Sequence, residues 1–498
     1  MSEKNVNGFE NAAKIYLYTI SLEKLRSYGR SVGVASATAK KKNDLIEEII
    51  GVLVGKIQPV EISKRGAPVK NDSVDQRVEE EMERLKELYL SDSGSGYAFD
   101  FEKEYKKMME RKTTLSVSSP LEKEEVRIGG RLAVFQGQLQ MLNGVSMLLP
   151  LNCIENEEKI IMPVIFIKMH DLREGDEITC YAAKNDDYLV ATLVLTVNGI
   201  PLKDLRRGHF NEMSVRLPTR RFTTYDGEFF PTMMGKYAEW LIQITEGQRG
   251  LVISSPKSGK TTALSELLQP LAALNEDVCV FCLLVDSSPE TVSKFRMLAG
   301  RDRLVYSTYE DDPERQVFVA DFILNRAKRY AESGRQVVLI VDSFNALARA
   351  YNDTEQSSGG KMLSCGLESK TVHYLKKYFG TARCLEKGGA LTILGAVNTN
   401  TGNPADDVIG AELCALANLE IRLSDSLAYK RVFPALALRD IRVMEDFAVK
   451  TEKEKALDAF LHEKFMPANS DEELLNAVKN SKTKEEFVQA VQAMATRE

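Results

Sequence analysis

The residues most able to do chemistry in this 498-residue chain lie in the stretch Gly250-Leu-Val-Ile-Ser-Ser-Pro-Lys-Ser-Gly-Lys-Thr-Thr262. Its apolar beginning predicts a buried strand, and its Gly-Lys-Thr end predicts the start of a helix. A loop in that place turns backbone N–H groups toward an anion at the positive end of the helix. We therefore expect a polyphosphate here, with Lys260 reaching the β- and γ-phosphates and the Thr261 hydroxyl ligating Mg²⁺. Ser254 replaces the first glycine of the GxxxxGK[ST] pattern.

A carboxylate follows a second apolar run, Arg335-Gln-Val-Val-Leu-Ile-Val-Asp342. At the end of a buried strand, Asp342 is placed to hold Mg²⁺ or its water opposite the threonine of the phosphate loop. An aspartate after a strand also serves as a helix cap, so this residue alone leaves both interpretations open. The Gly-Lys-Thr-Thr sequence upstream favours the metal.

A third strand end reads Val285-Asp286-Ser287-Ser288-Pro289-Glu290. A serine hydroxyl can hydrogen-bond a water molecule, but at neutral pH it does not accept a proton as a carboxylate does. We expect slow hydrolysis here unless Glu290 or Asp286 supplies the missing carboxylate.

The composition says more about the cellular compartment of the protein than about its binding partners. Lysine and arginine number 66 against 72 aspartates and glutamates, and the net charge of −6 neither supports nor excludes RNA binding. The seven cysteines are irregularly spaced, which favours buried thiols in a reducing cytosol over disulfides or zinc. The N-terminus lacks the pattern of a secretion signal and no apolar run approaches about 18 residues, so we expect a cytoplasmic protein that does not enter a membrane.

The strands and helices around these groups are expected to form four domains. Residues 1–57 show helical spacing, and residues 58–125 are rich in charge and predict a flexible or partly helical insert. Residues 126–205 hold five short β-rich runs, which favour a small barrel of the oligonucleotide-binding (OB) fold; the runs are VRIGGRLAVF, VSMLLPL, KIIMPVIFI, GDEITCYAA and YLVATLVLTV. Residues 206–498 include alternating strands and helices, typical of a parallel α/β sheet with ligands at the carboxyl ends of its strands.

Several long stretches resemble the Rho family of bacterial transcription termination factors, RNA-dependent ATPases of the RecA-like class. They are GQRGLVISSPKSGKTT, VDSFNALARAYN, SSGGKMLSCGLES, KKYFGTARCLEKGGALTILGAV, NLEIRLSDSLAYKRVFPAL and SKTKEEFVQAV. The resemblance covers most of the chain. It implies an α/β fold in which a RecA-like P-loop ATPase core follows a small helical subdomain and an OB-fold barrel.

The resemblance also implies roles for particular residues. It assigns Lys260, Asp342, Arg431 and Arg442 to catalysis, the two arginines across a subunit boundary, although the stretch around Arg442 is shorter than its usual counterpart. It assigns Thr261 and Asp342 to Mg²⁺, Lys361 to RNA, and Phe433 to stacking on adenine. The residues expected to contact ATP are Ser255, Pro256, Lys257, Ser258, Gly259, Lys260, Thr261, Thr262 and Phe433.

The chain departs from the family pattern at several places, among them Ala346, which stands where the family usually has an arginine, while Arg349 is retained. Ser287 and Ser288 replace an acid and an arginine near the γ-phosphate. Gly137-Gln-Leu-Gln-Met-Leu142 lacks the aromatic rings on which bases stack, a loss of about 1–3 kcal/mol per base. In the second RNA loop, at 398–408, Pro404 stands in place of a lysine, which predicts a weaker grip on RNA.

Three functions are compatible with this pattern. The first is an active Rho-type protein: a homohexamer that binds single-stranded nascent RNA, hydrolyses ATP and displaces the RNA polymerase elongation complex. The second is a Rho-derived nucleotide-binding regulatory or structural protein with weak or no hydrolysis. The third, a rotary or secretion-type ATPase subunit, is disfavoured because the RNA-loop and KRVFPAL stretches follow the Rho pattern.

Overall fold

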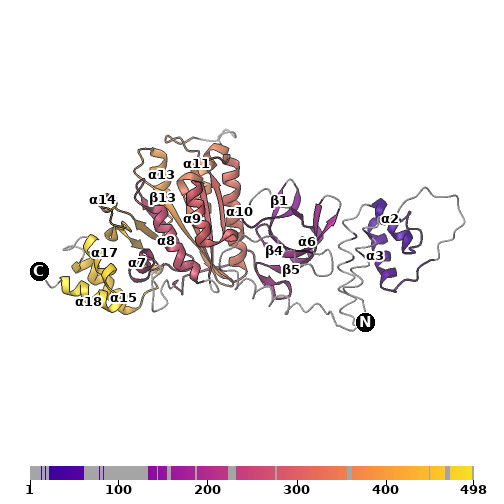
Figure 1. Ribbon diagram of the computed structural model, residues 1–498, viewed down its shortest axis with the longest axis horizontal. Helices are drawn as coiled ribbons and strands as arrows, with labels where there is room; N and C mark the ends of the chain where they lie inside the picture. The colour runs from indigo at the N-terminus through magenta and orange to yellow at the C-terminus, as the bar shows by residue number, and fades with distance from the viewer. Residues whose placement is uncertain are drawn as a thin grey trace. The chain divides into compact units, whose positions relative to one another are not determined.

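The structure of the protein is a computed structural model (Figure 1). It describes residues 13, 17, 22–60, 78, 82, 133–142, 144–153, 159–185, 188–222, 232–274, 278–355, 362–447, 449–465 and 471–495. The chain divides into two compact units. The first unit consists of residues 1–135, 160–172 and 179–195, and the second unit consists of residues 136–159, 173–178 and 196–498. The expected division into four domains stays a prediction, and most of the insert at 58–125 lies outside the described residues.

The first unit begins with helices α2 (Leu22–Ser31) and α3 (Lys42–Leu53). Apolar residues at helical spacing, such as Leu45, Ile46 and Ile49 of α3, are fully buried against Leu25 of α2. Helices are therefore present where the N-terminal spacing predicts them.

Six short strands form a second structure, a mixed sheet in the order β3-β2-β1-β4-β5-β6 with an additional β3–β5 pairing. Their bounds are β1 Ala133–Leu142, β2 Val145–Leu149, β3 Ile160–Ile161, β4 Glu177–Asn185, β5 Tyr188–Val197 and β6 Ile200–Pro201. Because β3 pairs with both β2 and β5, five of the strands close into a ring, as a small barrel requires. The OB fold itself stays a prediction.

One expected strand of this region is wrong. The run KIIMPVIFI at 159–167 contributes only the two residues of β3, after which Pro163 precedes helix α6 (Val164–His170). Proline is tolerated at a helix start, and a short apolar run does not distinguish a strand from a buried helix turn. Phe166 of α6 is 1% exposed, so burial rather than β-pairing explains the apolar residues.

The largest sheet belongs to the second unit and runs in the order β10-β9-β11-β13-β8-β14-β15, with β12 pairing to β13 and to β7. Neighbours from β10 to β14 are parallel, whereas β15 is antiparallel to β14. The strands are β7 Val215–Arg216, β8 Arg249–Ser254, β9 Val278–Ser287, β10 Leu304–Thr308, β11 Gln336–Asp342, β12 Arg383–Leu385, β13 Ala390–Asn398, β14 Leu419–Arg422 and β15 Arg442–Val443.

Helices cover both faces of this sheet (Figure 1). In β9, Val280 and Cys282 belong to one apolar cluster, while Phe281 and Leu283 belong to the other. A strand buried on both faces needs apolar residues at every position, which explains the unbroken runs in the sequence. The helices are α7 Met233–Tyr237, α8 Lys260–Ala273, α9 Pro289–Ala299, α10 Pro313–Glu332, α11 Phe344–Glu355, α12 Ser369–Phe379, α13 Pro404–Cys414, α14 Asp425–Tyr429, α15 Glu452–Phe460, α17 Asp471–Asn480 and α18 Lys484–Ala495.

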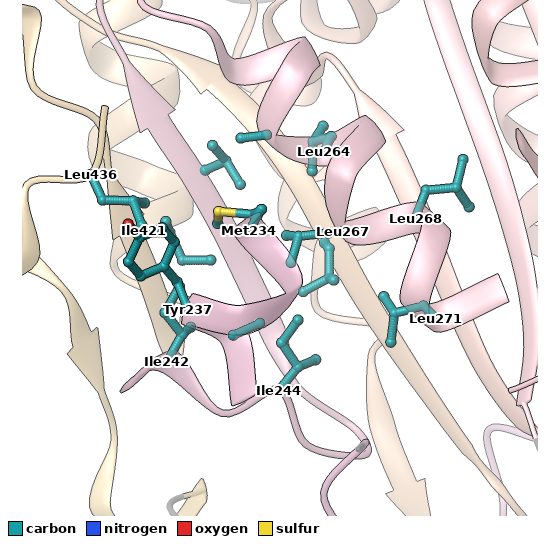
Figure 2. Close-up of a cluster of buried hydrophobic side chains, with 14 of the residues drawn as sticks. Met234, Tyr237, Ile242, Ile244, Leu264, Leu267, Leu268, Leu271, Ile421 and Leu436 are labelled. Carbon is teal, nitrogen blue, oxygen red and sulfur yellow. The ribbon is translucent and has the colours of Figure 1, made fainter. Parts of the chain in front are cut away.

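Figure 2 shows the part of the core that supports the phosphate loop. Met234 and Tyr237 of α7 lie among leucines of α8, including Leu264 and Leu267, and all four side chains are buried. Beyond them, the Tyr237 hydroxyl donates a hydrogen bond to the Leu475 carbonyl of α17. Packing against α7 therefore holds the buried face of α8 in place.

Two further expectations concern thiols and membranes. All seven cysteines are free, and burial raises the pKa of Cys180 and of Cys384 to about 12. None of the helices in the described parts of the chain has the length and hydrophobicity that crossing a lipid bilayer requires.

Candidate nucleotide-binding site

The phosphate loop joins the end of β8 at Ser254 to the start of α8 at Lys260. Gly259 has φ +97° and Lys257 has φ +68°, so the backbone turns through left-handed conformations before the helix begins. Gly259 is the N-cap of α8 and offers no side chain to its first turn. The N–H groups of that turn are left for an external anion, as a phosphate site requires.

Asp342 lies directly opposite the first turn of α8. The Thr261 Oγ1 donates a hydrogen bond of 2.6 Å to Asp342 Oδ2, and Lys260 Nζ lies 3.4 Å from Asp342 Oδ1. Asp342 is only 5% exposed. The structure thus brings together the three residues that the sequence selects from two distant segments.

This arrangement fits a magnesium ion. A hydroxyl and a carboxylate are hard oxygen ligands, and Mg²⁺ typically binds one or two such groups together with waters and phosphate oxygens. No cluster of three or more acidic, histidine or cysteine ligands occurs among the described residues, so a dedicated all-protein metal cage is absent there. Thr261 and Asp342 are the pair that would hold the ion beside a bound phosphate.

Two carboxylates near the end of β9, those of Asp286 and Glu290, are exposed. Asp286 is exposed with φ +55°, whereas Ser287 is 9% exposed. Ser288 is the N-cap of α9 and accepts a hydrogen bond from the Thr291 N–H. Hydrogen bonds from the Glu290 backbone N–H and from Ser288 lower the pKa of Glu290, which makes this carboxylate a weaker proton acceptor.

On the other side of the loop, Phe433 covers Gly259. Phe433 Cε1 lies 3.5 Å from the place that a Cβ atom would take at Gly259, and Phe433 is 55% exposed. The ring therefore borders the start of α8 with one part open to a ligand.

Asp425 is a neighbour of the loop that sequence reasoning missed. Ser258 is buried, and its hydroxyl donates a 2.6 Å hydrogen bond to Asp425 Oδ1 at the start of α14. The two residues are 167 positions apart, so no local pattern links them.

The two candidate arginines are not part of this cluster. Arg431 is exposed with φ +59°, and Arg442 is exposed on β15, opposite Glu420 of β14. Their action across a subunit boundary stays a prediction.

Of the two candidate RNA loops, the second is the better described, because Lys361 lies outside the described residues. Asp406 is buried and accepts hydrogen bonds from Asn345 Nδ2 at 2.7 Å and from Thr401 Oγ1 at 2.8 Å. Arg349 lies 3.4 Å from the same carboxylate. Pro404 is the first residue of α13, so the proline that replaces a lysine starts a helix here.

Comparison with known proteins identifies the family. Transcription termination factor Rho of Karelsulcia muelleri is 31% identical over 339 residues, covering 66% of this chain and 86% of that protein. Rho of Bacillus subtilis is 30% identical over 413 residues, covering 81% of this chain and 93% of that protein. The chain belongs to the Rho family.

A family model also matches the part of the chain that holds the site. The model of the ATP synthase alpha/beta family, nucleotide-binding domain, matches residues 236–440, which include the phosphate loop and Asp342. A solved prototypical ATPase from the type III secretion system of pathogenic bacteria aligns with TM-score 0.45 and 18% identity, covering 56% of this chain and 86% of that one. The resemblance to Rho and the α/β class with a RecA-like P-loop core are confirmed.

Proposed function

We propose that this Rho-family chain is an ATP-dependent RNA translocase that binds nascent single-stranded RNA and terminates transcription. It acts as a homohexamer on the RNA polymerase elongation complex in the bacterial cytoplasm. The observation that carries the proposal is the convergence of Lys260, Thr261 and Asp342 at the first turn of α8.

The geometry supports a separate role for each part of the site around bound ATP. The first turn of α8 and Lys260 bind the β- and γ-phosphates, while Phe433 provides a flat apolar surface for the base. Thr261 and Asp342 would hold Mg²⁺, which when bound shields the phosphate charge. Arg431 and Arg442 would complete the site of a neighbouring subunit, and Lys361 would contact RNA, as the family resemblance implies.

A second function, a nucleotide-binding regulator or structural protein with weak hydrolysis, is favoured by the β9 strand end. There the buried Ser287 supplies no carboxylate, and the lowered pKa of the exposed Glu290 reduces its basicity. Phosphoryl transfer depends mainly on positioning and electrostatics, and the cluster of Lys260, Thr261 and Asp342 supports both. We therefore place RNA-driven ATP hydrolysis first.

The test is ATP hydrolysis by the purified full-length protein with and without a pyrimidine-rich single-stranded RNA, repeated at several salt concentrations. We expect RNA to raise the rate several-fold in the wild type. Lys260→Ala should reduce both rates to background, because it removes the cation that contacts the β- and γ-phosphates. Lys455→Ala, on the exposed surface of α15, is the matched control and should behave as wild type.

The outcomes separate the two functions. Equal RNA-stimulated turnover in the wild type and in Lys260→Ala would contradict the phosphate-loop assignment. Magnesium-dependent ATP binding by calorimetry without RNA stimulation would support the second function instead.

A further inference from the structure

A small pocket lies beside the phosphate loop, on the face of α8 that Phe433 covers. Its lining residues are Gly259, Thr262, Ala263, Glu266, Leu423, Phe433, Pro434 and Ala435. Gly259 is the N-cap of α8 and three of the others lie in its first two turns, while the rest come from just after β14 and from the segment after α14. A ligand whose phosphates bind at the first turn of α8 would place its next rigid group in this pocket.

The lining is apolar with two exceptions. Leu423, Pro434, Ala435 and Ala263 are buried and carry no polar side chain. Only Thr262 and Glu266 bring polar side-chain atoms, and they lie four residues apart on one face of the helix. Such a lining offers an apolar surface to the face of a heterocycle and only two side chains that can recognise polar groups on its edge.

Two hydrogen bonds from the start of α7 position Glu266. Its Oε2 accepts a hydrogen bond of 3.1 Å from the Met234 N–H, and its backbone carbonyl accepts one of 2.8 Å from Thr232 Oγ1. Met234 is fully buried in the cluster of Figure 2, so this donor is fixed by packing. Within the described residues, Glu266 Oε1 has no hydrogen-bond donor and remains available to a ligand.

We propose that Glu266 determines base specificity by accepting a hydrogen bond from the exocyclic amine of adenine. This proposal rests on the proposed function, since it assumes that the site binds a nucleoside triphosphate. A carboxylate accepts hydrogen bonds and donates none, so a base that presents a carbonyl oxygen at the same edge meets repulsion. A fixed polar group left unpaired rejects the wrong ligand more strongly than an apolar wall does.

The test compares three nucleotides that differ at one edge of the purine: ATP, ITP, which has a carbonyl there, and purine riboside triphosphate, which has only hydrogen. Their Kd values are measured with Mg²⁺ on the full-length protein by competition against a fluorescent ADP analogue. In the wild type we expect ATP to bind about tenfold to a hundredfold more tightly than purine riboside triphosphate, the range of a charged hydrogen bond.

Glu266→Gln is the decisive variant. The amide keeps the size of the side chain and an oxygen for the Met234 N–H, but presents an N–H₂ group where the carboxylate oxygen faced the base. We expect ATP to lose most of its advantage over purine riboside triphosphate and ITP to bind more tightly than in the wild type. Glu314→Gln, an exposed residue in the first turn of α10, makes the same charge change outside the pocket and should preserve the wild-type ratios.

The possible results have separate meanings. A wild-type ratio near one, or the same ratio in Glu266→Gln, would overturn the role of Glu266 while leaving the proposed function intact. No binding of any triphosphate by the folded wild type would refute the proposed function. Glu266→Ala serves as a second variant: it should lower the selectivity for ATP without improving ITP binding, because it removes the acceptor and adds no donor.

Discussion

At the scale of single residues, Asp425 is the least expected neighbour of the site. Its carboxylate lies 2.6 Å from the hydroxyl of Ser258, a residue of the predicted phosphate loop. The contact can hold the loop in shape, but its negative charge opposes a polyphosphate. These two effects have opposite signs and are separable by substitution.

We predict that Asp425→Asn binds ATP about threefold to tenfold more tightly than the wild type at low salt, because the amide keeps an acceptor for Ser258 while removing a repulsive charge. The gain should shrink as salt increases, since Asp425 is exposed and its charge is screened. Asp425→Ala should bind more weakly than Asp425→Asn, because it also removes the hydrogen bond to the loop. Calorimetric titration at two ionic strengths measures both differences, and weaker binding by Asp425→Asn than by wild type would contradict the prediction.

At the scale of elements, a buried ion pair joins the start of β4 to helix α10. Arg326 donates to Glu177 Oε2 through Nε at 3.0 Å and also through Nη2, and the Tyr330 hydroxyl donates to the same oxygen at 2.6 Å. Both charged side chains are 3% exposed. The Arg326 guanidinium also lies 4.7 Å from the centre of the Phe281 ring, which ties the pair to strand β9.

We predict that Arg326→Met lowers the free energy of unfolding by about 3–5 kcal/mol, because it leaves the Glu177 carboxylate buried without its cation. The double variant Glu177→Gln with Arg326→Met should recover part of this loss, since no unpaired charge remains. Urea denaturation followed by circular dichroism measures both variants.

The matched control is Lys376→Met, which breaks an ion pair with Glu412 whose two side chains are each 41% exposed. Its effect should stay below about 1 kcal/mol. Equal destabilisation by the exposed and the buried substitution would show that burial does not determine the cost.

On the largest scale, one of the contacts that hold the C-terminal helices is a carboxylate shared by three distant segments. Glu454 of α15 accepts hydrogen bonds of 2.7 Å from Arg221, which precedes the core, and from Lys484 of α18. Burial alone would raise the pKa of Glu454, but the hydrogen bonds from Lys484, Arg221 and the Thr451 backbone outweigh it and lower the pKa to about 2.

A lowered pKa gives this carboxylate a defined effect on acid stability. Folding favours the ionised form, so the contribution of Glu454 is complete above its ordinary pKa of 4.5 and is lost as the pH falls toward about 2. We predict that Glu454→Gln is less stable than the wild type at pH 7 and that the difference narrows across this window. Urea midpoints measured from neutral to acidic pH test this, and a difference independent of pH would contradict it.

Much of the fold and half of the site could be predicted from local sequence. The phosphate loop is contiguous, and Asp342 ends an apolar run. A strand buried on both faces of a sheet has apolar residues at its interior positions, so the acid at its end stands out. The same reasoning failed at 159–167, where the apolar run is a two-residue strand followed by α6, because burial demands apolar residues in either element.

Short contiguous segments are enough to predict a phosphate loop and an acidic strand end at the carboxyl edge of a parallel sheet, because both signals are local. Three contacts become visible only in the folded chain: Ser258 bonds to Asp425, Met234 fixes the carboxylate of Glu266, and Arg326 pairs with Glu177. Each of these contacts joins residues far apart in the chain. Their partners are chosen by how helices pack on the sheet, and no spacing along the chain encodes that choice.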